Sequence, residues 1–186
     1  GAFVLCPAGL SCPAQRIGRI IHYASRKALD IESLGEKNVR RLVDMGLIQD
    51  LADLYTLDKD QLQKLDGFAE KAAGKLYDAI QASKHPPLDR FLYALGIRHV
   101  GERVAGILAG KYGSLEDLAE ADRDELEAIP EVGPEIAAGV ADFFHEKENR
   151  ELLTRLADYG VKPRAPEDRS GTALDGLTFV FTGDLA

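Results

Sequence analysis

One short segment recurs four times along this chain, and it carries the residues with the clearest capacity for chemistry. The four copies are residues 33–39, 67–73, 99–105 and 131–137. Each copy has an apolar residue at its second position, between neighbours that are mostly small, and the third positions are 34, 32 and 32 residues apart. Such a turn lets the backbone approach another surface closely, because few side chains stand in the way.

The amide groups that follow each turn are the expected binding groups. The first N–H groups of a helix have no partner within the helix, and the positive end of the helix dipole lies behind them. They bind anions, and the phosphates of a nucleic-acid backbone are anions that repeat at a matching spacing. A basic residue at the fifth position, which is Lys37, Lys71 or Arg103, adds charge in three of the copies.

We therefore expect the turns to form a DNA-binding site that contacts phosphates and ignores base sequence. The expected contact residues are Leu34, Gly35, Lys37, Gly67, Phe68, Ala69, Lys71, His99, Val100, Gly101, Arg103, Val132 and Gly133. Ala69 replaces a glycine, which requires a turn without positive φ at that position. A valine in place of Gly101 is expected both to block close approach and to resist the turn.

The fourth copy departs from this pattern because Glu135 stands where the others carry a basic residue. Glu131 and Asp142 add further negative charge around it. The fourth turn should therefore repel phosphate, unless it serves as a structural partner of the third.

Helices are expected on both sides of each turn. Around the second turn, apolar residues recur at helical spacing, namely Leu51, Leu54, Leu57, Leu76 and Ile80. Strand-like alternation is missing throughout residues 14 to 160. Pro86 and Pro87 must end the helix that contains Ile80, so the four copies fall into two pairs. The sequence predicts an all-α domain of four tandem helix-hairpin-helix motifs in two pairs related by a pseudo-twofold axis.

Composition and charge limit the possible functions. The chain has 186 residues, 45% hydrophobic and 29% charged, which excludes a disordered or collagen-like protein. It contains neither a long apolar run nor a signal peptide, so we expect a cytoplasmic protein that does not bind membranes. The net charge of −8 argues against binding by bulk positive charge. The acidity is local, however, because residues 115–160 carry −10 while residues 1–30 and 61–114 each carry +3.

Other functions remain open at this point. The turns could merely join the helices of an antiparallel bundle, with glycine ending each helix. A protein-interaction scaffold could use the acidic fourth copy and never touch DNA. The module could also belong to another DNA-repair protein. Four copies in register favour phosphate binding, and titration of a duplex at two salt concentrations would identify a scaffold.

Candidate metal-binding and catalytic residues are few. Cys6 and Cys12 could form half of a four-ligand zinc site, or they could be two ordinary thiols. Residues 64–67 spell K-x-D-G, a nucleotidyltransferase motif, but they fall at a helix end and in the second turn. We therefore expect no catalytic residue in this chain.

Several longer segments resemble one enzyme family. The run Cys12-Pro13-Ala14-Gln15, residues 22–31, Leu34-Gly35 and residues 91–101 resemble bacterial NAD-dependent DNA ligases, and the similarity covers roughly residues 3 to 162. Residues 174–183 resemble the first strand and turn of the BRCT domain that closes such ligases. The resemblance implies four parts: half of a four-cysteine zinc finger at 1–13, the helix-hairpin-helix domain at 14–160, a linker at 161–173, and a truncated BRCT strand at 174–186.

The same resemblance implies a function for the parent protein. These bacterial cytoplasmic ligases use NAD and magnesium to seal nicks between a 5′-phosphate and a 3′-hydroxyl in DNA replication and DNA repair. Their adenylation domain lies upstream, so this chain should bind neither NAD nor magnesium and should be inactive alone. Cys6 and Cys12 are implied as half of a zinc site. The implied partners are nicked double-stranded DNA and the remaining ligase domains in cis, with the chain itself a monomer.

Overall fold

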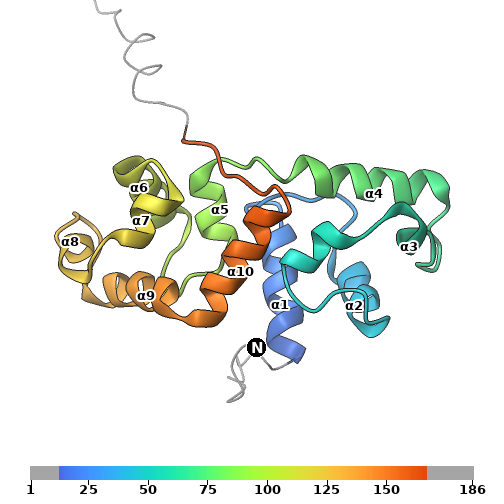
Figure 1. Cartoon of the computed structure of the whole chain (residues 1–186), viewed down its shortest axis with the longest axis horizontal. Helices are drawn as coiled ribbons and strands as arrows, with labels where there is room; N and C mark the ends of the chain where they lie inside the picture. Colours follow the sequence, from blue (N-terminus) through green and yellow to red (C-terminus); the bar gives the residue numbers. More distant parts are fainter. Residues whose placement is uncertain (1–12, 167–186) are drawn as a thin grey trace, which may run out of the picture.

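The computed structural model describes residues 13–166, which form helices joined by turns and loops (Figure 1). The all-α tandem expected from the sequence is confirmed for this part of the chain. Its helices are α1 (Pro13–Ala24), α2 (Glu36–Asp44), the 3-10 helix η2 (Ala52–Thr56), α3 (Lys59–Gln63), α4 (Glu70–Ala82), α5 (Leu88–Ala94), α6 (Glu102–Tyr112), α7 (Leu115–Glu120), α8 (Arg123–Glu127), α9 (Pro134–His145) and α10 (Lys147–Asp158). No helix of residues 13–166 is both long and apolar enough to cross a bilayer.

The expectations for the cysteine pair and for the BRCT strand lie outside these residues. Cys6 and Cys12 precede residue 13, and residues 174–186 follow residue 166. The zinc half-site and the truncated strand therefore stay predictions.

Two short helices start with the same capping arrangement. Asp58 accepts a hydrogen bond from the Gln61 N–H (2.8 Å), and the Gln61 side chain accepts one from the Asp58 N–H (3.0 Å). Asp122 and Glu125 repeat this box at the start of α8, with the same two distances. The box supplies partners for N–H groups that the helix itself leaves unpaired. The second and fourth hairpins therefore begin alike, 64 residues apart.

The chain folds as two neighbouring halves joined near Pro86 and Pro87. In Figure 1, α1 to α4 occupy one side and α5 to α9 the other, with α10 crossing the middle. Helix α4 ends at Ala82, as the proline pair predicts. Helix α10 contacts η2 of the first half and α9 of the second.

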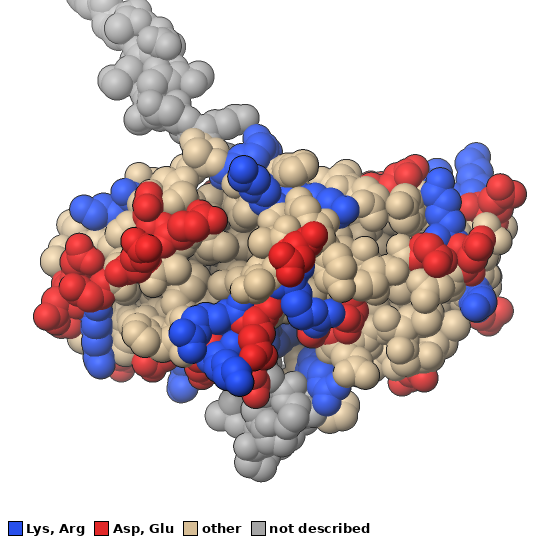
Figure 2. Space-filling model, viewed as in Figure 1, with Lys and Arg blue, Asp and Glu red and all other residues tan. Residues whose placement is uncertain are grey.

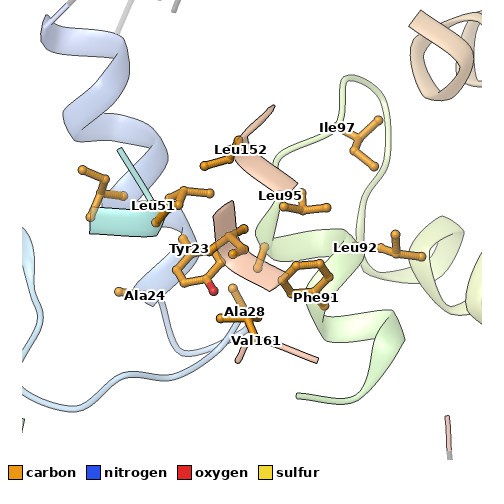
Figure 3. Packing of buried hydrophobic residues seen from close by; sticks show 14 of the residues in the cluster. Tyr23, Ala24, Ala28, Leu51, Phe91, Leu92, Leu95, Ile97, Leu152 and Val161 are labelled. Carbon is orange, nitrogen blue, oxygen red and sulfur yellow. The ribbon is translucent and has the colours of Figure 1, made fainter. Parts of the chain in front are cut away.

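A single core of buried apolar side chains runs through both halves. Figure 3 shows its central part, where Tyr23 of α1 and Phe91 of α5 lie near Leu152 of α10 and Val161. Tyr23 and Phe91 are among the largest fully buried side chains. Burial of each such aromatic side chain stabilises the fold by about 1.5–3 kcal/mol. The two halves therefore share one core.

The backbone beyond α10 stays attached to the fold. The Lys162 N–H donates to the Lys84 carbonyl (2.7 Å), and the Arg164 N–H donates to the Pro86 carbonyl (2.8 Å). The Leu88 N–H donates to the Arg164 carbonyl (2.8 Å), and Pro87 and Arg164 form an isolated parallel bridge. Residues 161–164, expected as the start of the linker, are thus bound to the segment that joins the halves.

A charged contact fastens α10 to the first half. The Arg155 guanidinium donates to Asp50 (2.6 Å) and to Asp53 (2.7 Å), more than 100 residues away in sequence. The hydrogen bond that Arg155 donates to Asp53 raises the pKa of Arg155. Asp50 and Asp53 also accept the backbone N–H groups of residues 49, 50, 52 and 53, which hold both carboxylates in place independently of Arg155.

Three buried hydroxyl groups form a hydrogen-bonded chain between α1, η2 and the end of α4. The Tyr23 and Tyr55 oxygens lie 2.6 Å apart, and the Tyr55 oxygen lies 2.8 Å from that of Ser83. Ser83 donates to the Ile80 carbonyl (2.6 Å), so it must accept from Tyr55, and Tyr55 must accept from Tyr23. Burial raises the pKa of both tyrosines.

Candidate nucleic-acid interface

The four turns share one backbone conformation. The first residue of each has a positive φ, with values of 69° for Ser33, 82° for Gly67, 67° for His99 and 72° for Glu131. Positive φ is uncommon for residues other than glycine, yet three of the four are not glycine. The segment found four times in the sequence is therefore a repeated turn in the backbone.

The second residue of each turn is an anchor. Its N–H donates to the carbonyl three residues earlier, at 2.9–3.2 Å in all four copies. The side chains of Leu34, Val100 and Val132 are buried, and that of Phe68 is partly buried. These four residues were expected as DNA contacts, but their side chains pack against the core, so their role at the surface is limited to the backbone.

The helices that follow the turns begin without a side-chain cap. Gly35, Ala69, Gly101 and Gly133 are the N-cap residues of α2, α4, α6 and α9, and none supplies a capping hydrogen bond. In contrast, Asp58, Ser114 and Asp122 cap α3, α7 and α8 with their side chains. Four helix N-termini thus present N–H groups to an outside acceptor. Helix α9 presents fewer free N–H groups, because Pro134, its first residue, has no N–H.

The backbone conformation at the third position of each turn does not require glycine. Its φ lies between −73° and −90° with extended ψ, a region that every residue adopts. The expected tolerance of Ala69 is confirmed, whereas the expectation that valine at Gly101 resists the turn is wrong. A Cβ on Gly35, Gly101 or Gly133 would meet nothing within 4 Å. The small residues leave open space beside the exposed N–H groups.

The basic residues of the turns differ in their surroundings. Lys37 and Lys71 are exposed, and neither forms an ion pair with residues 13–166. Arg103 is 79% exposed, but its guanidinium contacts Glu131 at 2.6 and 2.7 Å. Because Glu131 is the first residue of the fourth turn, that turn is a structural partner of the third, one of the two outcomes the sequence left open.

A similar contact joins the first two hairpins. Arg41 of α2 donates to the Asp66 carbonyl (2.8 Å), and its guanidinium lies 3.8 Å from the Asp66 carboxylate. Asp66 immediately precedes Gly67. In each half, an arginine on the second helix of one hairpin thus reaches the turn of the next. Sequence reasoning missed Arg41, since nothing in the repeat marks it.

The remaining expected contacts are on the surface. Gly67 and His99 are exposed first residues of their turns, while Ala69 is exposed at the third position. His99 forms no hydrogen bond with another residue of the described chain. In Figure 2, acidic side chains gather toward the end of the molecule that holds α7 and α8, so the field near the fourth hairpin is unfavourable for phosphate.

Comparison with known families supports the arrangement of paired hairpins. Residues 25–82 match the family model described as SAM-like helix-hairpin-helix tandem. Residues 90–153 match the model described as helix-hairpin-helix motif. The two matches fall on either side of Pro86 and Pro87, one in each half.

Most of the chain is similar to part of several DNA ligases. The chain is 51% identical over 177 residues, or 95% of its length, to a DNA ligase of Geobacter sulfurreducens. The DNA ligases of Geobacter metallireducens and Haloarcula marismortui are 50% and 47% identical over 95% and 100% of the chain. The chain therefore matches one segment of these DNA ligases. It spans 26–27% of the length of these relatives, so it corresponds to one part of a ligase.

Proposed function

We propose that this chain is the DNA-binding part of an NAD-dependent DNA ligase, and that its hairpin turns hold the phosphate backbone of a nicked duplex. The observation that carries the proposal is the set of four uncapped helix N-termini, each behind a turn of the same conformation. An anion at such a terminus accepts N–H groups and is stabilised by the helix dipole.

The combination of an uncapped helix with the repeated turn supports this function. Helices α3, α7 and α8 have side-chain caps, whereas α5 and α10 have none although no hairpin turn precedes them, so a missing cap is informative only behind a turn. The four helices behind the turns instead leave their N–H groups open, beside glycines with no neighbour within 4 Å of an added Cβ at three of the turns. Contacts of this kind bind the backbone of any sequence, which suits a ligase that must act wherever a nick occurs.

The wider role concerns the parent enzyme. We propose that it seals 5′-phosphate/3′-hydroxyl nicks in DNA replication and repair, with NAD and magnesium bound by other ligase domains in cis. The chain holds no catalytic residue in this proposal and is inactive alone. Cys6 and Cys12 would provide two of the four ligands of a zinc site, and the protein would act as a monomer in the cytoplasm.

The test is a salt titration with a fluorescent nicked duplex. Gly101→Val should fold with a melting temperature only a few degrees below that of the parent, because its backbone region suits valine although valine is a poor N-cap residue. It should weaken binding by roughly tenfold by blocking approach. Gly110→Val is the control, since Gly110 lies near the end of α6 with nothing within 4 Å of an added Cβ. If the parent shows no salt-dependent binding, the scaffold interpretation replaces this one.

A further inference from the structure

Basic side chains from three separate segments meet where the two halves join. The first segment follows α1, the second connects α4 to α5 and includes the start of α5, and the third follows α10. We call this cluster the hinge patch, and its residues are Arg26, Lys27, Lys84, Arg90, Lys162 and Arg164.

Backbone contacts bring the three segments together. The Lys162 N–H donates to the Lys84 carbonyl (2.7 Å), and the Arg164 Nε donates to the His85 carbonyl (2.8 Å). The Arg90 guanidinium lies 3.5 Å from the Arg26 carbonyl. Figure 2 shows Lys and Arg side chains gathered beside the point where the described chain ends.

Four of these six cations are not neutralised by acidic side chains of the described residues. Arg26, Lys27, Arg90 and Lys162 are exposed, and none of them forms an ion pair with residues 13–166. Asp89 is the single acidic residue in the segment 84–90. In a chain of net charge −8, this concentration of cations creates a local positive potential that attracts a polyanion.

Lys84 of the hinge patch lies apart from the second turn. Lys84 follows the C-terminal end of α4, while the second turn precedes its N-terminal end. A helix of 13 residues is about 20 Å long, so a phosphate held by the second turn cannot also contact Lys84. A phosphate at Lys84 is therefore a different one from the phosphate held by the second turn.

We propose that the hinge patch is a second binding site for backbone phosphates of the duplex that the hairpin turns hold. This inference rests on the proposed function. The hinge patch would contact the duplex between the segments held by the two hairpin pairs, and it would contribute charge without any helix N-terminus.

A charge-neutralised variant of the full chain tests the inference. The variant carries Arg26→Gln, Lys27→Gln and Lys162→Gln, whose side chains make no hydrogen bond or ion pair with the described residues. The control carries Lys111→Gln, Arg123→Gln and Arg150→Gln, three exposed cations with the same total charge that lie outside the hinge patch and the turns and form no ion pair with the described residues. Binding to a nicked duplex of about 40 base pairs is measured from low to high salt, and thermal melting verifies that both variants fold.

The expected result is a smaller salt dependence for the hinge-patch variant alone. Each lost phosphate contact lowers the slope of log K against log salt by about 0.9, so the slope should fall by about one to three. Equal slopes and affinities in the two variants, whether both reduced or both unchanged, would overturn the inference. In that case, a loss of binding in Gly101→Val would leave the proposed function standing. A parent chain that binds no duplex would contradict the proposed function itself.

Discussion

Tyr55 lies at the centre of the buried hydroxyl chain, where each group has a fixed role. It accepts from Tyr23 and donates to Ser83, with oxygen separations of 2.6 and 2.8 Å. Neither tyrosine stood out in the sequence, because their meeting depends on how α1, η2 and the end of α4 pack. The turn residues could be predicted, since their positions repeat, whereas this network has no periodic signal.

We expect Tyr55→Phe to lower the free energy of unfolding more than Tyr23→Phe does. The first change leaves the Tyr23 O–H as a buried donor without an acceptor, which should cost about 1–3 kcal/mol. The second removes one donor and leaves Tyr55 bonded to Ser83, so the loss should be about 0.5–1.5 kcal/mol. Urea unfolding of both variants measures the difference, and the reverse order would contradict the assigned direction of the chain.

The same tyrosines should make the protein sensitive to alkali. Burial raises the pKa of Tyr23 well above its usual value and raises that of Tyr55. The unfolded chain releases these protons near pH 10, whereas the folded chain retains them, so the free energy of unfolding should fall as pH rises above about 10. Tyr23→Phe should show a shallower fall in urea titrations between pH 8 and 11, and an unchanged slope would argue against this cause.

At the scale of elements, the turns are joined in pairs by contacts that the repeat pattern does not contain. Arg41 reaches the second turn, and Arg103 reaches the fourth. The existence, order and spacing of the hairpins could be predicted because apolar anchors recur at a fixed interval. The pairing contacts could not, since Arg41 lies two residues beyond the first copy whereas Arg103 is the fifth residue of the third.

Because of this pairing, we expect Lys71 and Arg103 to contribute differently to DNA binding. Lys71 forms no ion pair with residues 13–166, so Lys71→Ala should lower the salt slope by about one. Arg103 is already held by Glu131, so Arg103→Ala should lower it by less. Glu131→Gln releases Arg103 and should strengthen binding. Salt titrations of the three variants decide this, and equal losses for Lys71→Ala and Arg103→Ala would show that the ion pair is unimportant.

A close contact between α9 and the third turn leads to a separate expectation. A Cβ on Gly139 would lie 2.6 Å from the Arg98 carbonyl oxygen, so Gly139→Ala should destabilise the fold by about 1–3 kcal/mol. Gly106→Ala is the matched control, since Gly106 lies within α6 with nothing within 4 Å of an added Cβ. It should stabilise by about 0.5–1 kcal/mol. Thermal melting measures both, and a neutral Gly139→Ala would mean that α9 moves easily.

At the scale of the whole molecule, α10 and the shared core make the two halves one unit. Arg155 connects α10 to Asp50 and Asp53, and Val161 lies in the same core as Tyr23 and Phe91. The division into two pairs could be predicted from Pro86 and Pro87. The attachment of residues 161–164 could not, because the backbone hydrogen bonds that hold them leave no trace in side-chain pattern.

We expect Arg155→Ala to weaken both halves together. Asp50 and Asp53 keep their backbone N–H partners. The free energy of unfolding should therefore fall by about 1–2 kcal/mol, which is less than when a buried charge is left without any partner. Unfolding should remain a single transition, with hydrogen exchange rising both in residues 49–56 and in α10. Two separate transitions would indicate that the halves fold independently.

The bridge between Pro87 and Arg164 also determines how the molecule would bear mechanical load. A pull on residue 166 would reach the joining segment first, because the hydrogen bonds at Lys84, Pro86 and Leu88 hold the backbone there. That segment continues directly into α4 on one side and α5 on the other. Tension would therefore pass to α4 and α5 through this segment as well as to α10 through the chain itself.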